Sequence, residues 1–111
     1  MKLLLVEDHA AFAEHLLRDV LSAHEVTWVA TLSEGLVACG GGSFDAILVD
    51  YDLPDGKGAR LVRQLRALED PTPVVAISAH APGNEALLEA GATVACPKAE
   101  KDRLPEVLAG V

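Results

Sequence analysis

Polar side chains that could do chemistry together follow the apolar runs of this sequence, where the runs end. Glu7 and Asp8 follow the first run, Asp50 follows the third, Ser78 follows the fourth, and Lys98 comes shortly after the fifth. If these runs are parallel strands, their carboxyl ends meet at one edge of a sheet, where the functional groups of such folds gather. The sequence therefore predicts one shallow pocket that holds acids, a hydroxyl and an ammonium group.

The chemistry of such a pocket follows from its charges. Carboxylates in close reach repel one another, and a divalent cation held by oxygen atoms relieves that repulsion. We therefore expect Mg²⁺ near Asp8 and Asp50. A lysine and a hydroxyl suit the other oxygens of a tetrahedral anion, and an aspartate can itself be the nucleophile that forms an aspartyl-phosphate. These residues favour phosphoryl transfer to an aspartate.

Five short apolar runs, rich in β-branched residues and mostly without polar alternation, indicate strands that are buried on both faces. The runs are residues 3–6, 26–30, 46–49, 74–77 and 93–96. Apolar residues at helical spacing lie between and after them. These are Phe12, Leu16, Leu17, Val20 and Leu21; Leu61, Val62, Leu65 and Leu68; and Leu104, Val107 and Leu108.

This alternation predicts an α/β fold, a doubly wound (βα)5 flavodoxin-like three-layer sandwich whose parallel sheet has the order 2-1-3-4-5. The second strand is then an edge strand. The length of 111 residues is that of one domain, so we expect residues 1–111 to form a single domain.

Charge and composition limit the kinds of partner that this protein can bind. The net charge of −8 repels nucleic acid and anionic membrane surfaces, so we expect direct binding to neither. Only four apolar residues separate Lys2 from Glu7, too few for a secretory signal or a membrane span, and the predicted location is cytoplasmic. Cys39 and Cys96 show no metal-like spacing and are expected to be reduced core thiols.

Taken in order, the site residues resemble the receiver domain of bacterial two-component response regulators. The resemblance covers essentially the whole chain and rests on five motifs: Glu7-Asp8; Asp50 with Leu53-Pro54 and Gly58; Ser78-Ala79; Gly91-Ala92; and Lys98. The "VEDH" start and Lys98-Ala99-Glu100 are most similar to receivers of the NarL/LuxR-type branch, which usually carries a helix-turn-helix output. These 111 residues do not contain that output, and whether an output domain is missing from them stays open.

The resemblance implies a Mg²⁺ site. Asp8 would bind the ion directly, together with the carboxylate of Asp50. Glu7 would assist through a bound water, and Asp52 would contribute its backbone carbonyl.

The resemblance also implies a phosphorylation-dependent switch in a phosphorelay. Asp50 would be the phosphoacceptor, and Ser78 and Lys98 would bind phosphoryl oxygens. The phosphoryl donor would be a sensor histidine kinase or a histidine phosphotransfer protein. The domain would catalyse only its own phosphorylation and dephosphorylation, without turnover of a small substrate.

Most of these residues also have a simpler structural interpretation. Asp8 is a favoured cap for the first helix, and capping does not exclude metal binding. Lys98 alone would be a solvated loop charge, and Ser78 alone a helix cap or a core hydroxyl. Asp55 is expected to shape a turn with the glycines that follow it.

The glycine run 40–42 leads from a helix toward a strand, which is the reverse of a phosphate loop, so we interpret it as a helix stop and a flexible connection. The four histidines share no metal-like spacing, and His9, His15 and His24 are expected to be surface or half-buried residues.

His80 is the exception among the histidines. His80 and Asp52 each lie two residues after a pocket residue. In receivers these two positions flank the pocket mouth and influence hydrolysis of the acyl phosphate. Our hypothesis is that both tune its lifetime, and the alternative is plain surface exposure.

The sequence departs from the receiver pattern at the fifth strand. Receivers often have Tyr or Phe three residues before the lysine, where this chain has Ala95, and that puts the usual output coupling in doubt. Pro97 removes a backbone donor before Lys98, so we expect the approach of the lysine to the pocket to be altered.

The fourth helix is expected to be short. The stretch 78–91 is shorter than in the receivers that this chain resembles, and Pro82-Gly83 breaks the helical pattern early. Little more than residues 84–90 remains for the helix.

Two rival functions stay open on the sequence. The first is a pseudo-receiver, with the same fold used as a phosphorylation-independent protein-interaction module. The second is a small phosphate-ester hydrolase, which needs an acid and a substrate-binding cap for which the chain has no insertion. The cognate kinase, the output and the oligomeric state do not follow from the sequence.

Overall fold

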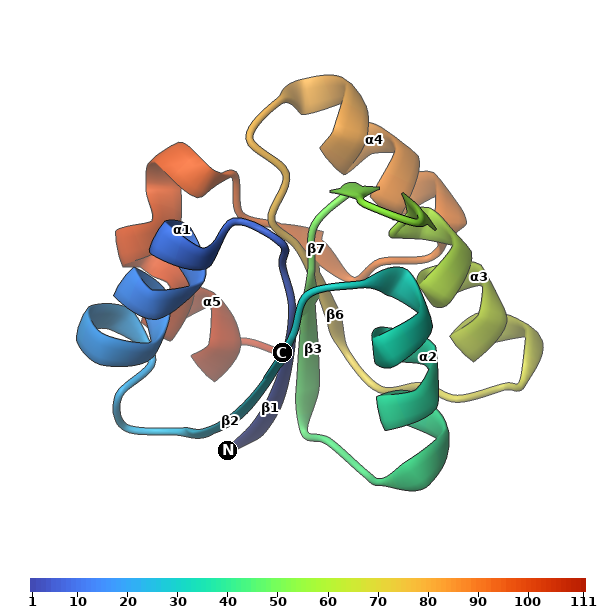
Figure 1. Cartoon of the computed structure of the whole chain (residues 1–111), viewed down its shortest axis with the longest axis horizontal. Coiled ribbons are helices and arrows are strands. Elements are labelled where there is room, and N and C mark those ends of the chain that lie inside the picture. The colour runs from blue at the N-terminus through green and yellow to red at the C-terminus, as the bar shows by residue number, and fades with distance from the viewer.

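The computed structural model describes residues 1–111. The protein is built around a sheet of five parallel strands (Figure 1). The strands are β1 (Lys2–Val6), β2 (Glu25–Val29), β3 (Ala46–Val49), β6 (Val74–Ala76) and β7 (Val94–Ala95). Their order is β2-β1-β3-β6-β7. The predicted order 2-1-3-4-5 is confirmed, because β6 and β7 are the fourth and fifth strands of this sheet.

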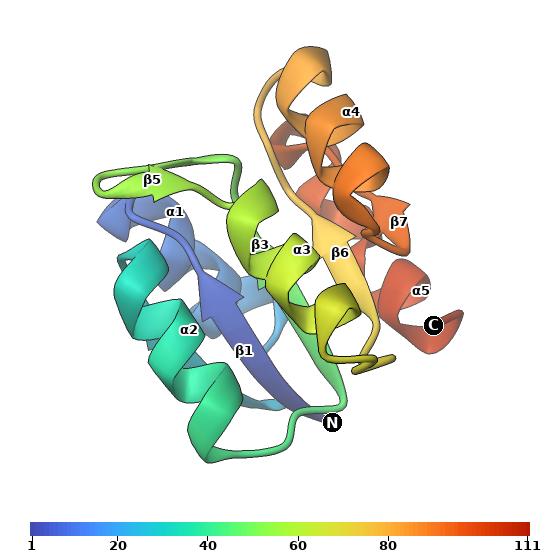
Figure 2. The same ribbon diagram turned by 90° about the vertical axis from the view of Figure 1, so that its right-hand side faces the viewer.

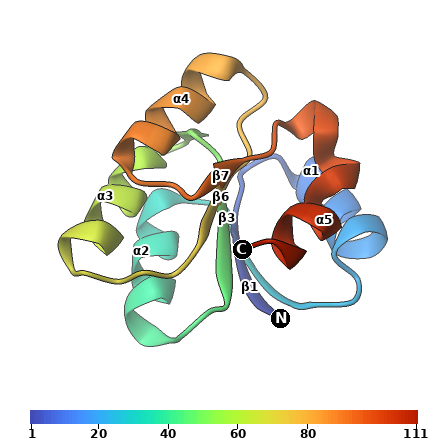
Figure 3. The ribbon, with the colours of Figure 1, turned by 180° about the vertical axis from the view of Figure 1, so that it is seen from behind.

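Helices cover both faces of the sheet and make a three-layer sandwich (Figure 3). One face carries α1 (Ala10–His15), its π-helical continuation η1 (Leu16–Val20), and α5 (Leu104–Ala109), which the 3₁₀ segment η2 (Lys98–Arg103) precedes. The other face carries α2 (Leu32–Gly41), α3 (Ala59–Ala67) and α4 (Ala81–Ala90). No helix is long and apolar enough to cross a membrane.

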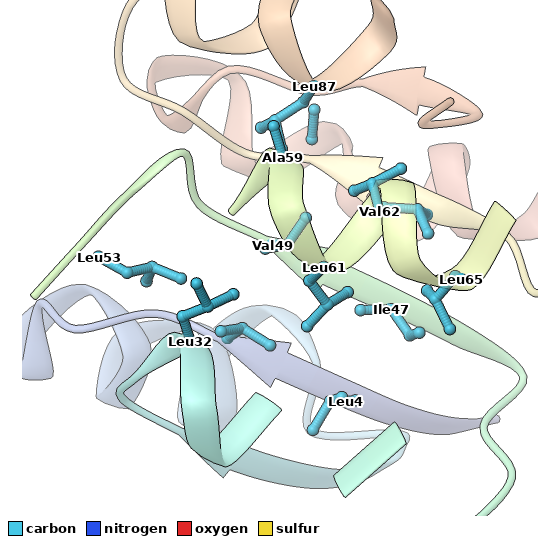
Figure 4. Packing of buried hydrophobic residues seen from close by; sticks show 13 residues of the cluster. Leu4, Leu32, Ile47, Val49, Leu53, Ala59, Leu61, Val62, Leu65 and Leu87 are labelled. Carbon is cyan, nitrogen blue, oxygen red and sulfur yellow. The ribbon is translucent and has the colours of Figure 1, made fainter. Parts of the chain in front are cut away.

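The central strands β1, β3 and β6 are buried because both of their faces are covered, whereas the edge strands β2 and β7 are partly exposed, contrary to the expectation for all five runs. Leu3, Leu4, Leu5 and Val6 of β1 all have no exposed surface. Successive side chains of a strand point to opposite faces, and β1 accordingly serves two cores. Leu4 and Val6 join the cluster under α2, α3 and α4 (Figure 4), whereas Leu3 and Leu5 join the cluster under α1 and α5.

A small hairpin follows β3 and reaches toward the start of α2 (Figure 2). Its strands are β4 (Asp52–Leu53) and β5 (Gly56–Lys57), and Asp55 lies in the turn. The two carboxylate oxygens of Asp55 accept hydrogen bonds from the backbone N–H groups of Leu32, at 2.7 Å, and Ser33, at 3.0 Å.

These bonds, with that from Ser33 as the largest effect, hold the pKa of Asp55 below its usual value. They also satisfy two N–H groups that the first turn of a helix leaves unpaired. Asp55 therefore lies in a turn, as predicted, and in addition ties the hairpin to α2.

The fourth helix is not short, and this prediction was wrong. α4 spans ten residues, Ala81–Ala90, and begins directly after His80. Pro82 lies in the first turn, where a missing N–H costs no helical hydrogen bond. The ring Nδ1 of His80 accepts a hydrogen bond from the N–H of Gly83 at 3.2 Å. The pair that was interpreted as a break therefore starts the helix.

The glycine run 40–42 does not end the helix at its first residue, as a helix stop would. α2 continues through Gly41, and Gly42 is the first residue with extended backbone, at φ −157° and ψ 175°. The run still leads from a helix toward β3 and starts no helix.

Both cysteines are free thiols, as predicted. Cys96 is buried, whereas Cys39 is only half-buried. Burial raises the pKa of the Cys39 thiol to about 11.

Gly58, at the start of α3, has no room for a side chain. An added Cβ would lie within contact distance of the Asp50 carbonyl and 2.9 Å from Cγ2 of Val49. We expect Gly58→Ala to lower the free energy of unfolding in urea by roughly 1–3 kcal/mol, as overpacking does. Gly40→Ala is the matched control, because nothing lies within 4 Å of its added Cβ. In a helix we expect this control to gain about 0.5–1 kcal/mol. Similar losses in both variants would contradict this account.

Candidate functional site

The carboxyl ends of β1, β3 and β6 lie side by side at one edge of the sheet, as Figure 1 shows at the top of the view. Val6 pairs with Val49, and Val49 pairs with Ala76. The pairing continues past the strands, since the N–H of Asp50 donates to the carbonyl of Val6 at 3.0 Å. The strand register therefore brings the polar residues that follow these strands together.

Lys98 lies between two carboxylates. Its Nζ is 2.7 Å from Oε1 of Glu7 and 3.1 Å from Oδ2 of Asp50, and these side chains are 13%, 0% and 7% exposed. Burial by itself lowers the pKa of Lys98, but hydrogen bonds to Glu7 and Asp50 outweigh it and raise the pKa. The ammonium also lies 4.8 Å from the centre of the Phe12 ring. Lys98 therefore keeps its positive charge beside Asp50.

Glu7 and Asp8 form the acidic side of the pocket. Burial raises the pKa of Glu7, and the nearby Lys98 ammonium only partly opposes this effect. Oδ1 of Asp8 is buried and accepts no hydrogen bond. One ligand atom from each of Glu7, Asp8, His9 and Asp50 lies within 4.8 Å of the other three. This donor set, with an unpaired carboxylate oxygen, fits a hard divalent cation.

Asp50 is held at both of its carboxylate oxygens. Oδ1 accepts a hydrogen bond from the N–H of Tyr51 at 2.8 Å, and Oδ2 faces Lys98. The residue is 5% exposed. These contacts fix the carboxylate of Asp50 in the acidic cluster that it forms with Glu7, Asp8 and His9.

Ser78 is buried and braced by a residue that sequence reasoning missed. The side-chain amide of Asn84 accepts a hydrogen bond from the N–H of Ser78 at 2.8 Å and donates one to its carbonyl at 3.1 Å. The N–H of Lys98 donates to the same carbonyl at 3.3 Å. Asn84 sits within a helical pattern, and nothing in its sequence position marks it as a clamp.

The hydroxyl of Ser78 lies at the start of α4. Its Oγ accepts a long hydrogen bond, 3.4 Å, from the N–H of His80. Ser78 is thus not the cap of α4, whose N-cap is His80, and its hydroxyl is buried, as the core interpretation predicts.

Asp52 and His80 lie in contact. Nε2 of His80 is 3.2 Å from Oδ2 of Asp52, and Lys57 pairs with the other carboxylate oxygen. Hydrogen bonds from Lys57 and His80 lower the pKa of Asp52. The contact bridges the β4–β5 hairpin and the start of α4. Both side chains are exposed, yet neither is merely solvated.

The cap interpretation of Asp8 was wrong. The residue at the N-cap of α1 is His9, and no side chain caps this helix. His9 was expected to be an ordinary surface residue. Its side chain is 72% exposed, but its ring belongs to the acidic cluster.

Pro97 does not keep Lys98 from the pocket, and a change in the approach of the lysine relative to other receivers stays a prediction. The chain turns into η2 directly after Pro97, and the lysine side chain still reaches both carboxylates.

A comparison with known families agrees with this geometry. A family model described as the response regulator receiver domain matches residues 3–109. This chain belongs to that family. A receiver domain is a signalling module.

Two solved receivers are similar over nearly the whole chain. The receiver domain of sensor histidine kinase PA1611 from Pseudomonas aeruginosa is 30% identical with a TM-score of 0.84, and the match covers 98% of this chain and 94% of that one. That structure has a magnesium ion coordinated in its active site cleft. The signal receiver domain named NarL from Mycobacterium tuberculosis is 26% identical with a TM-score of 0.81, and the match covers 99% and 97%. The NarL/LuxR-type branch is therefore not singled out and stays a prediction.

A curated relative, the swarming motility regulation protein RssB of Serratia marcescens, is 31% identical over 80 residues. The match covers 71% of this receiver but only 36% of that protein.

The fifth strand of this receiver lacks an aromatic residue. Ala95 is half-buried in β7 and packs against the cluster under α2, α3 and α4. The ring of Tyr51, next to Asp50 in the chain, packs against the same cluster and lies 5.1 Å from Nζ of Lys57.

The buried Glu7 carboxylate makes a testable contribution to stability. The pKa of Glu7 in the folded protein lies above the usual 4.5. Above this raised pKa the buried carboxylate is charged and destabilises the folded state, whereas below pH 4.5 the carboxyl is protonated and this destabilisation is absent. We expect Glu7→Gln to raise the free energy of unfolding at neutral pH. The gain should shrink as the pH falls from the raised pKa of Glu7 toward 4.5.

The measurement is urea unfolding across that pH range. Glu85→Gln, at an exposed position of α4, is the control and should show no such pH-dependent gain. A Glu7→Gln protein that is less stable than wild type at neutral pH would contradict the account.

Proposed function

We propose that this receiver is a phosphorylation-dependent switch in a two-component phosphorelay. It takes a phosphoryl group on Asp50 from a phosphohistidine of a sensor histidine kinase or a histidine phosphotransfer protein, with Mg²⁺. The observation that carries the proposal is the buried ammonium of Lys98, 2.7 Å from Glu7 and 3.1 Å from Asp50. A fixed positive charge beside a buried carboxylate suits an incoming anion.

The transfer follows from the groups around Asp50. A carboxylate oxygen of Asp50 attacks phosphorus, a P–O bond forms, the P–N bond to the donor histidine breaks, and the imidazole leaves. Lys98 offsets the negative charge that the phosphoryl group brings. The hydroxyl of Ser78 donates to a phosphoryl oxygen.

The acidic residues would hold the cation. Asp8 and Asp50 would offer carboxylate oxygens, Asp52 its backbone carbonyl, and Glu7 a contact through water. A bound Mg²⁺ supplies charge neutralisation at the phosphoryl oxygens. The unpaired Oδ1 of Asp8 supports this assignment, as does the magnesium ion in the similar histidine-kinase receiver.

The signal would leave the pocket through the residues that Ser78 and Lys98 anchor. Ser78 is clamped by Asn84 of α4, and Lys98 begins η2, which leads into α5. New bonds from these two side chains to a phosphoryl group would favour one arrangement of both elements over another.

The competing function is a pseudo-receiver that binds a protein partner without phosphorylation. Ala95 favours it, because the fifth strand has no ring that could turn inward. The two functions differ in whether partner binding depends on phosphate.

The remaining parts of the proposal concern setting. We propose that residues 1–111 act as one receiver domain in the cytoplasm and contact no nucleic acid or membrane directly. The net charge of −8 supports the absence of such contacts.

The experiment that tests the function is intact-protein mass spectrometry after incubation with acetyl phosphate and Mg²⁺. We expect a gain of one phosphoryl group, which is lost in Asp50→Asn and with a chelator, because the acceptor and the cation are both needed. Asp102→Asn, an exposed position on η2, is the matched control and should be labelled like wild type. No gain in a folded sample, with another receiver labelled in parallel, would favour the pseudo-receiver.

The lifetime of the acyl phosphate should depend on the contact between Asp52 and His80. This contact joins the hairpin that follows Asp50 to the start of α4. We propose that it limits the access of water to the acyl phosphate. We expect His80→Ala and Asp52→Asn each to speed the decay of the phosphorylated form a few-fold, followed by mass spectrometry over time. Decay rates equal to wild type in both variants would remove the tuning hypothesis.

A further inference from the structure

The imidazole of His9 lies at the rim of the acidic cluster, at a position that we expected to be an ordinary surface residue. Its Nδ1 is 3.5 Å from Oε2 of Glu7 and 3.9 Å from Oδ1 of Asp8. The second of these oxygens is the buried one that accepts no hydrogen bond. Two adjacent ligands of an octahedral ion, each about 2.1 Å from it, lie about 3.0 Å apart. Both distances from Nδ1 exceed this value by less than about 1 Å, which a small rotation of the exposed ring would close.

The orientation of the ring is also that of a ligand. Nδ1 of His9 is 3.4 Å from Nζ of Lys98. An ammonium group has only donors, so Nδ1 is the acceptor in this contact and its lone pair faces the cluster. The Nδ1 lone pair therefore already points at the positive charge of Lys98. The carboxylates of Glu7 and Asp50 contact the same ammonium group.

Nothing else in the structure occupies this nitrogen. His9 is the N-cap residue of α1, but its side chain makes no capping bond, and its backbone N–H is satisfied by Glu7 at 3.0 Å. The ring is free to turn on a residue whose backbone is fixed, which suits a side chain that closes on an ion.

A nitrogen ligand changes which cation the site prefers. Carboxylates, carbonyls and water suit Mg²⁺, whereas imidazole suits Zn²⁺, Ni²⁺ and Cu²⁺. For a given mixed set of donors, affinity rises from Mn²⁺ through Co²⁺ and Ni²⁺ to Cu²⁺. A set that adds one imidazole to the carboxylates of Asp8 and Asp50 therefore binds a first-row transition ion more tightly than the carboxylates alone would.

We propose that His9 is an additional, nitrogen ligand of the cation site, and that through it this receiver binds first-row transition metal ions such as Co²⁺ in preference to Mg²⁺. The inference rests on the proposed function, because it takes the acidic pocket to be a cation site. It goes beyond that function by naming a further ligand and the class of metal that this ligand selects.

The test compares Co²⁺ and Mg²⁺ binding by isothermal titration calorimetry in wild type, His9→Asn and His24→Asn. Asparagine is a favoured N-cap, so His9→Asn should keep the fold while it replaces the nitrogen ligand with an amide. His24→Asn is the matched control, because His24 contacts the N-terminal amine at 3.2 Å, at the other end of β1. The single tryptophan, Trp28, donates to the Glu7 carbonyl at 2.8 Å, so its fluorescence gives a second measure of binding.

We expect wild type to bind Co²⁺ more tightly than Mg²⁺. We expect His9→Asn to lose at least about tenfold in Co²⁺ affinity, the cost of disturbing a metal site, with little change for Mg²⁺. His24→Asn should bind both ions like wild type. Pulsed electron paramagnetic resonance of the Mn²⁺-loaded protein should show coupling to an imidazole nitrogen, which disappears in His9→Asn.

The outcomes separate the two proposals. If both ions bind and His9→Asn weakens neither, or weakens both equally, the assignment of His9 is overturned while the cation site stands. If no divalent ion binds the folded wild type, the assignment and the Mg²⁺ site of the proposed function both fail.

Discussion

The buried ammonium of Lys98 between Glu7 and Asp50 is the interaction on which the pocket depends. The ammonium makes one positive charge, whereas the cluster around it contains three carboxylates, including the incompletely paired Asp8. Burying such charges costs free energy that a single ion pair does not return in full, and the raised pKa of Glu7 is the visible consequence. The protein thus gives up stability at this edge and gains an acidic cluster that could hold a cation.

The pocket keeps its geometry despite this excess of negative charge because residues outside it restrain the backbone at Glu7, Ser78 and Asp50. The carbonyl of Glu7 accepts from the indole of Trp28 on β2, and Asn84 clamps both backbone groups of Ser78. Gly58 lets α3 start close behind Asp50. Each restraint comes from a different element, so the geometry of the pocket belongs to the fold rather than to any one loop.

Much of the fold could be predicted because its signals are local. The run at 46–49 is fully buried and matches β3 at both ends, since four apolar residues between polar ones leave little choice. The prediction of α4 failed because proline can break a helix or begin one, and the decision lies in the N-cap bond that His80 makes to Gly83. Helical spacing also failed to mark Asn84, because the same spacing holds for any polar residue on that helix.

The sequence by itself determined where the five strands lie along the chain and therefore which acids, hydroxyl and ammonium follow them, because apolar runs between polar residues mark strands. It did not determine every strand end, since the run 93–96 contains only the two residues of β7, Val94–Ala95. Only the tertiary structure decided the contacts between those ends: the position of Lys98 between Glu7 and Asp50, the bridge from Asp52 to His80, the bond from Asp55 to α2, and the place of His9 in the acidic cluster. These contacts depend on the directions of side chains and join residues that are far apart along the chain, up to 91 positions for Glu7 and Lys98. The spacing of residues in a sequence contains no information about side-chain directions or about such distant pairs.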